Sequence, residues 1–254
     1  MKPRAMNLDG AADVPSLVGV MVLLDSSGSM ASIKQPMEAA FKKFVEDQRA
    51  TNPDGMWVSL AQFDGAPRIG AGGLSETLRY QQVYDRTPLA DVAKLLLTPS
   101  GGTPLCDALV RFATDAKAIV DDPTDQTDKL ILVVITDGQE NASTEHTWAQ
   151  AKELIDALEG QGCETIWLGT DGALEEVQAQ APTFTSGGAS IAYDINPASV
   201  AYAGNTLSYA VATSRMVGGS VLRSASLHYQ ATHAAPIPGP TNTDVADVDK
   251  TPVL

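Results

Sequence analysis

Three apolar segments, each ended by a short polar turn, constrain the fold of this chain most. They span residues 17–24, 129–135 and 164–168, and the turns behind them read DSSGS, TDG and GTDG. An apolar run of this length, bounded by a turn, is typical of a strand that is buried on both faces of a sheet. We therefore expect three central strands, each with a polar and acidic carboxyl end.

Segments with helical spacing of apolar residues alternate with these strands, at 33–45, 104–120, 148–158 and 198–217. Such alternation predicts βαβ crossovers and a parallel sheet. Residues 56–63 favour a more peripheral strand, and residues 66–73 are expected to pair back with it as a short hairpin. The expected fold class is α/β: a doubly wound, mostly parallel central sheet flanked by helices, with one short antiparallel edge strand.

The composition excludes several function classes. With 31 Asp and Glu against 17 Lys and Arg, the formal net charge is -14, so we expect no general binding to nucleic acid or to an anionic membrane. The two cysteines, Cys106 and Cys163, are too few for a disulfide framework or a cysteine-based zinc site.

The sequence also predicts a location and a domain organisation. We find no apolar signal segment near the N-terminus and no stretch near 18 apolar residues. We therefore expect a cytoplasmic protein, or a virion-associated one if a phage encodes it. We predict an N-terminal extension at 1–13, one domain at 14–217, and a C-terminal extension with a mobile, proline-containing tail at 218–254.

Oxygen-bearing side chains gather where the predicted strands end. Asp25, Ser27 and Ser29 form a D-x-S-x-S turn, Asp137 ends a second strand, and Thr103 follows two glycines before a helix. Ligands of open parallel sheets bind at this edge. Any one of these loops alone is more often a turn or a helix cap. Together, two carboxylates and three hydroxyls form an all-oxygen set that suits Mg²⁺, Mn²⁺ or Ca²⁺ better than zinc.

At these residues the sequence resembles the von Willebrand factor A domain family, also called the integrin I-like fold, over roughly residues 14–217. The matching signature is its metal-ion-dependent adhesion site (MIDAS), with D-x-S-x-S at 25–29, the threonine at 103 and the aspartate at 137. The segments GGTPLCDAL and ITDGQENAS are most similar to prokaryotic and phage members. The resemblance implies an intact site in which the two serines and the threonine contact a metal. It also implies that the aspartates contact the metal directly or through water, and that a partner's Glu or Asp completes the shell.

The resemblance therefore predicts a non-enzymatic, metal-dependent protein-binding module, with Mg²⁺ or else Mn²⁺ or Ca²⁺ as the ion. One alternative is a structural component of a larger assembly, such as a phage particle or a complex with a MoxR-type AAA+ ATPase. A weaker alternative is a Mg²⁺-dependent phosphatase with Asp25 as nucleophile. The haloacid-dehalogenase-like motif has a second aspartate where this chain has Ser27, and no lysine near the motif loops is placed to hold phosphate.

Three further residues are candidate neighbours of the site: Asp64 after the second predicted strand, Glu140 just past Asp137, and Cys106. Asp64 and Glu140 either flank the site or, more commonly for such residues, are solvated loop acids. We expect Cys106, three residues after Thr103, to be a small buried side chain and neither a ligand nor a nucleophile.

Overall fold

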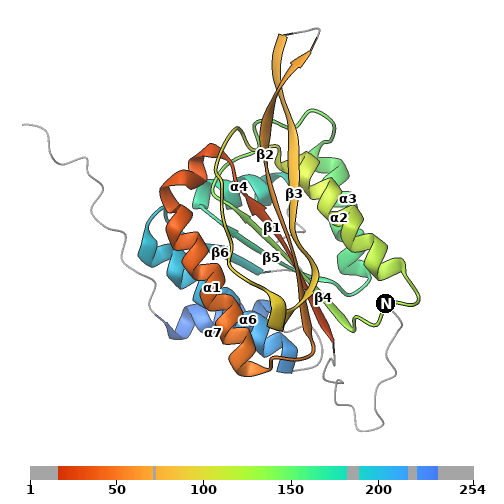
Figure 1. Ribbon diagram of the computed structural model, residues 1–254, viewed down its shortest axis with the longest axis vertical. Coiled ribbons are helices and arrows are strands. Elements are labelled where there is room, and N and C mark those ends of the chain that lie inside the picture. The colour runs from red at the N-terminus through yellow and green to blue at the C-terminus, as the bar shows by residue number, and fades with distance from the viewer. Residues whose placement is uncertain (1–16, 71–72, 182–188, 217–221, 234–254) are drawn as a thin grey trace, which may run out of the picture.

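The computed structural model describes residues 17–70, 73–181, 189–216 and 222–233. Its centre is one six-stranded sheet with the order β3-β2-β1-β4-β5-β6 (Figure 1). The strands are β1 (Val18–Asp25), β2 (Met56–Gly70), β3 (Gly73–Pro88), β4 (Lys129–Thr136), β5 (Glu164–Gly169) and β6 (Ala189–Ala192). All neighbouring strands run parallel except β2 and β3, which are antiparallel. The predicted α/β class and the mostly parallel sheet are confirmed.

Helices cover both faces of this sheet. The helices on one face are α1 (Lys34–Thr51), α6 (Pro197–Met216) and α7 (Leu222–Thr232). The helices on the other face are α2 (Leu105–Asp121), α3 (Trp148–Gly160) and α4 (Asp171–Gln180). Two short 3-10 helices, η1 (Gly28–Ile33) and η2 (Leu89–Asp91), complete the elements. Among the described residues, no helix is long and apolar enough to cross a membrane.

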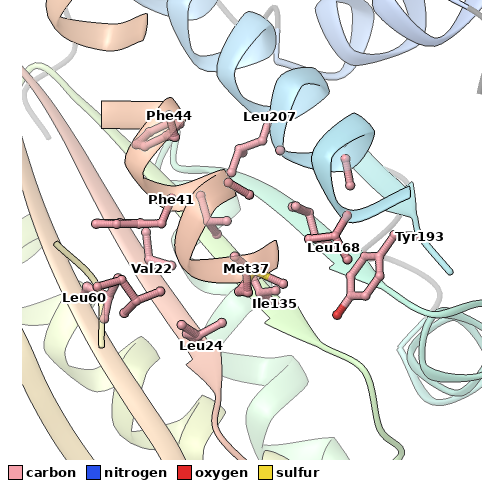
Figure 2. A pocket seen from close by; sticks show the side chains of 16 residues that line it. Val22, Leu24, Met37, Phe41, Phe44, Leu60, Ile135, Leu168, Tyr193 and Leu207 are labelled. Carbon is pink, nitrogen blue, oxygen red and sulfur yellow. The ribbon is translucent and has the colours of Figure 1, made fainter. Parts of the chain in front are cut away.

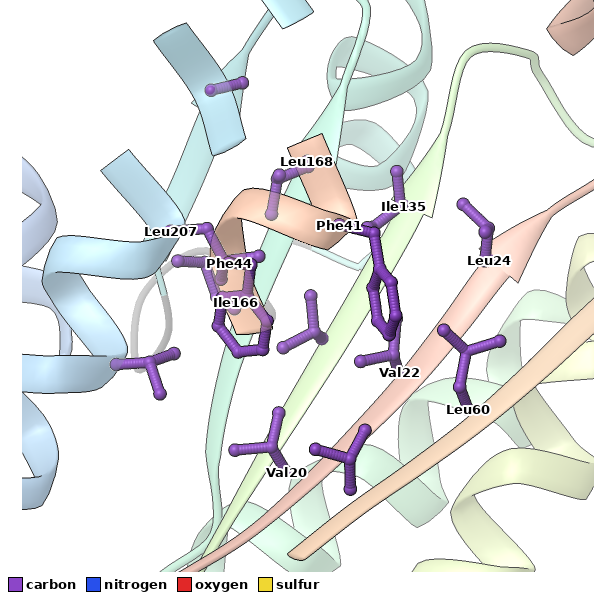
Figure 3. Packing of buried hydrophobic residues seen from close by; sticks show 14 of the residues in the cluster. Val20, Val22, Leu24, Phe41, Phe44, Leu60, Ile135, Ile166, Leu168 and Leu207 are labelled. Carbon is purple, nitrogen blue, oxygen red and sulfur yellow. The ribbon is translucent and has the colours of Figure 1, made fainter. Parts of the chain in front are cut away.

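The central strand β1 separates two hydrophobic cores. Val20 and Val22 pack with α1 and α6, where Phe41 and Phe44 fill the space above the sheet (Figure 3). The alternate residues Met21 and Leu23 pack with α2 and α3. Because successive side chains of a strand point to opposite faces, a strand between two helical layers is apolar throughout. This is why the apolar runs identified β1, β4 and β5 from sequence.

The antiparallel edge strand is much longer than the short hairpin that we expected at 66–73. β2 has 15 residues and β3 has 16, and they pair from Trp57 and Pro88 out to Gly70 and Gly73. β1 pairs with β2 only as far as Asp25 and Phe63, so the rest of the hairpin projects beyond the sheet (Figure 1). The outer end of this projecting part lies beyond the helices (Figure 1), and it therefore lacks the apolar alternation that marks a half-buried strand.

Some predicted segments extend beyond the described residues. The N-terminal extension at 1–13, Val217 and the tail from residue 234 lie outside the described ranges, so the domain limits remain predictions. Within the predicted C-terminal extension, α7 packs against α6 and β6. The helix α4 and the strand β6 were not expected from the sequence, because their apolar patterns are short.

Candidate metal centre

The five predicted ligand residues lie at the carboxyl edge of the sheet, where the strand order reverses. β1 pairs with β2 on one side and with β4 on the other, and the flanking helices α1 and α2 lie on opposite faces. Such a reversal opens a crevice outside the carboxyl ends of the two central strands. The loop after β1, the loop before α2 and the end of β4 meet there.

Four of these residues are joined by short hydrogen bonds. The hydroxyls of Ser27 and Ser29 lie 3.0 Å apart, and Ser29 Oγ donates to Asp137 Oδ1 at 2.7 Å. Asp25 accepts from the Ser27 backbone N–H and from Thr136 Oγ1, both at 2.7 Å. The structure thus brings together the D-x-S-x-S turn and the end of β4, which are more than 100 residues apart in the chain.

Thr103 reaches the same space from the third loop. Gly138 leaves room for it, because a Cβ atom there would lie 3.2 Å from Thr103 Oγ1 and 3.8 Å from Ser29 Oγ. Asn141 holds the Thr103 backbone with two bonds. Its Oδ1 accepts from the Thr103 N–H at 2.8 Å, and its own N–H donates to the Thr103 carbonyl at 3.2 Å. The hydroxyls of Ser29 and Thr103 therefore flank one small space beside Gly138.

Two buried carboxyl groups give this space its electrostatic character. Burial raises the pKa of Asp25 to about 6, against the lowering effect of its hydrogen bonds from Ser27 and Thr136. Burial also raises the pKa of Asp137, although the Ser29 hydroxyl stabilises its charged form. Asp137 Oδ2 is buried and has no hydrogen-bond partner, and no described lysine or arginine pairs with either carboxyl group. A cation is the group that would offset this desolvation cost.

The available donors fit a hard divalent ion. Nowhere in the described part of the chain do three or more His, Cys, Asp or Glu side chains form a group that could hold a metal. A metal at this edge would therefore depend on the three hydroxyls as well as on the two carboxylates. Oxygen ligands of this kind match Mg²⁺, Mn²⁺ or Ca²⁺, and the unpaired Asp137 Oδ2 is a ready acceptor for one.

Two residues, one at the site and one near it, were not found from sequence. Thr136 orients Asp25, and its position directly before Asp137 was the available signal. Tyr193 follows β6 and lines a small apolar cavity under α1 and α6 (Figure 2). Its hydroxyl is buried without a hydrogen-bond partner, and its pKa is raised by burial and by the charges of Asp137 and Asp25. No motif or residue spacing in the sequence predicts that Tyr193 lies near these loops.

The flanking acids are not free loop acids, contrary to the commoner interpretation from sequence, because Asp64 is buried and Glu140 is half-buried and hydrogen-bonded. The Glu140 carboxylate accepts from the backbone N–H groups of Cys106, Ala142 and Ser143, and it thereby ties the loop after β4 to the start of α2. Asp64 is only 1% exposed and forms an ion pair with Arg79. The prediction that Cys106 is a small buried side chain is confirmed.

Comparisons with known proteins agree with this architecture. The family model of the von Willebrand factor type A domain matches residues 20–139, which include all three loops of the site. The pilus adhesin SpaC from Lactobacillus rhamnosus GG, in its open conformation, is 14% identical with a TM-score of 0.54. That similarity covers 80% of this chain but only 31% of the adhesin chain, and it shows a shared fold.

Two metal-loaded structures resemble this chain less. Proximal thread matrix protein 1 from the mussel byssus, with a zinc-occupied MIDAS motif, is 17% identical with a TM-score of 0.45 over 70% of this chain and 42% of its own. The manganese-loaded TRAP protein of Plasmodium vivax is 14% identical with a TM-score of 0.40 over 70% of this chain and 69% of its own. The comparison with curated proteins gives no significant match. The family model and the shared fold lead to one conclusion: residues 20–139 match the von Willebrand factor type A domain, and the chain has the same fold as the adhesin.

Proposed function

We propose that this protein is a metal-dependent protein-binding module. In this proposal Asp25, Ser27, Ser29, Thr103 and Asp137 form a MIDAS and hold one divalent cation, with Mg²⁺ as the expected ion. The observation that carries the proposal is the buried, unpaired Asp137 Oδ2 beside the three hydroxyls. Domains of this family commonly mediate protein–protein interactions, which supports a binding role.

The chemistry of the five residues favours an acidic ligand. Three of the five donors are neutral hydroxyls, so they leave the charge of the cation only partly compensated. When bound, the cation supplies a Lewis-acid position that a carboxylate from outside can occupy. Because the chain carries a net charge of -14, a partner that presents its Glu or Asp among basic residues associates most readily. The protein then acts by binding and is not an enzyme.

A structural role in a larger assembly is the second candidate. Three large apolar side chains are exposed on α6 and α7, at Tyr209, Met216 and Leu227. Exposed apolar residues on adjacent helices can mark a contact with another protein. This candidate, which includes a phage particle or a complex with an AAA+ ATPase, predicts association that persists after metal is removed.

A small carboxylate tests the proposed function directly. Propionate is titrated into the full chain with Mg²⁺ and then with a chelator, while backbone amide signals are followed by ¹H–¹⁵N NMR. We expect propionate to shift the signals of residues 25–29, 103 and 137 only when Mg²⁺ is present. Equal shifts in the presence of chelator, or no shift at these residues, would overturn the proposal.

A partner is then identified with two matched variants. The double variant Asp25→Asn, Asp137→Asn removes two carboxylates from the site. The control Asp85→Asn, Asp91→Asn removes the same charge from exposed positions on β3 and η2. Quantitative cross-linking supports the proposal if a partner is captured by the wild type and by the control but is lost with the site variant or with chelator. A partner captured equally by all three proteins supports the structural role instead.

A further inference from the structure

A polar cavity lies next to the candidate metal centre, under the base of the projecting hairpin. Its volume is about 170 Å³, and the residues that line it are Ser26, Gln62, Asp64, Arg79, Gln81 and Thr98. Ser26 stands in the sequence between two of the predicted metal ligands, but its hydroxyl donates to the Phe63 carbonyl at 3.0 Å, on β2. The cavity and the metal centre thus share the loop after β1.

The carboxylate of Asp64, at this cavity, has one oxygen with hydrogen-bond donors and one without. The register pairs Phe63 with Asp25, which places Asp64 one residue further along the neighbouring strand. Its Oδ2 accepts from Arg79 and from Ser100 Oγ at 3.2 Å, and it shares the single Ser26 hydroxyl hydrogen, at 3.4 Å, with the Phe63 carbonyl. Its Oδ1 is buried and has no partner. A buried carboxylate oxygen without a donor is costly, so this atom is an acceptor that requires a donor from outside.

Arg79 supplies the complementary donors. Its Nη2 donates to Asp64 and to Ser100, which uses both hydrogens of that nitrogen. In the described part of the chain, its Nε and Nη1 hydrogens have no partner, and the side chain is 48% exposed. Asp64 and Arg79 both line the cavity, and between them they have one unpaired, buried acceptor and several unpaired donors.

The charges of this pair decide which group fits. Arg79 repels an ammonium or guanidinium group, and the buried carboxylate of Asp64 repels an anion. A neutral group with both a donor and an acceptor satisfies both residues. We propose that the cavity is a binding subsite for a carboxamide, the side chain of an Asn or Gln of a protein partner. Its NH₂ group donates to Asp64 Oδ1 and its carbonyl accepts from Arg79.

The position of this subsite constrains the partner. Neighbouring strands lie about 4.8 Å apart, and alternate side chains of an extended segment lie about 7 Å apart on one face. A partner segment that places an acid on the cation can therefore place a carboxamide two residues away in the cavity. This link to the metal rests on the proposed function, whereas the subsite itself does not.

Three small probes of equal length test the subsite. Propionamide, propionate and propylammonium are titrated separately into the full chain in the presence of chelator, and the amide signals are followed by NMR. We expect propionamide alone to shift the signals of Ser26, Asp64 and Ser100, with millimolar affinity. No shift with propionamide, or equal shifts with all three probes, would show that the cavity holds only water and would overturn the proposal.

A conservative variant keeps this test independent of folding. Arg79→Lys retains the positive charge beside Asp64 but removes the planar set of donors, and we expect it to weaken propionamide binding by about tenfold. The matched control is Arg111→Lys, which alters another exposed arginine that pairs with an aspartate. Unchanged binding in Arg79→Lys contradicts the proposal. Mg²⁺ is then added to the same samples to test the metal centre separately. The propionamide shifts test the subsite and the Mg²⁺ shifts test the metal centre, so either set can fail while the other is retained.

Discussion

Replacing Asn141 with alanine tests whether the loop after β4 positions Thr103 for metal binding. Asn141 Oδ1 accepts from the Thr103 N–H at 2.8 Å, and Thr103 itself is 2% exposed. Asn141→Ala removes this acceptor but leaves the second bond, from the Asn141 N–H to the Thr103 carbonyl, in place. The variant therefore loosens the loop without removing any predicted metal ligand.

The expected loss of stability in Asn141→Ala is that of one hydrogen bond. A typical intramolecular hydrogen bond contributes about 1 kcal/mol net to stability, with a spread of about half that value. We therefore expect the free energy of unfolding to fall by about 0.5–1.5 kcal/mol. If Thr103 must be in place before the ion binds, the same free energy weakens Mg²⁺ binding by about twofold to tenfold.

Two measurements and two controls make this prediction decisive. Mg²⁺ affinity is measured by calorimetry, and stability is measured by urea unfolding of the metal-free protein. Asn52→Ala removes a similar exposed acceptor, which bonds the Asp54 N–H at 3.1 Å, and it should lower stability without changing Mg²⁺ affinity. Asn141→Asp retains the acceptor and should keep the affinity. If Asn141→Ala loses stability but binds Mg²⁺ as the wild type does, Asn141 does not position Thr103 for the metal.

Three further predictions follow from buried groups. Arg215→Met leaves several carbonyls at the C-terminal end of α1 without their charged donor, so urea unfolding should show a loss of about 2–4 kcal/mol, and a loss near zero would refute this role. Gly19→Ala places a Cβ atom 2.2 Å from the Trp57 ring, and we expect about 1–3 kcal/mol of destabilisation, whereas an unchanged unfolding midpoint would contradict the packing. Burial raises the pKa of the Cys106 thiol and that of Cys163, the latter to about 12, so neither should react with Ellman's reagent near neutral pH until the protein is unfolded; rapid reaction of the native protein would disprove this.

The sequence allowed the central strands to be predicted because they are buried on both faces. Their side chains meet a helical layer on each side, so apolar residues dominate these strands and end where the strand leaves the core. The loops at these ends carry the predicted ligand residues, and the parallel arrangement brings them to one edge. Metal binding by these residues stays a prediction.

The sequence did not allow the hairpin or its contacts to be predicted, because they depend on pairing beyond the core. β2 and β3 continue past the end of β1, and their outer ends lie beyond the helices (Figure 1). The partner of Asp64 is Arg79, which lies opposite it in the register of this long hairpin. Because the sequence does not indicate how long the hairpin is, Asp64 is interpreted from the sequence as a loop acid. Similarly, Glu140 is half-buried and accepts a hydrogen bond from the backbone N–H of Cys106, which lies at the start of α2, 34 residues earlier in the chain.

Calorimetric titration of Mg²⁺ into chelator-treated protein tests the central claim most directly. The wild type and the control Asp85→Asn, Asp91→Asn are expected to bind a single ion with the same affinity. The variant Asp25→Asn, Asp137→Asn, with its fold checked by circular dichroism, is expected to bind none. Failure of the wild type to bind Mg²⁺, Mn²⁺ or Ca²⁺, or equal binding by the folded site variant, would contradict the assignment of these residues as a metal centre.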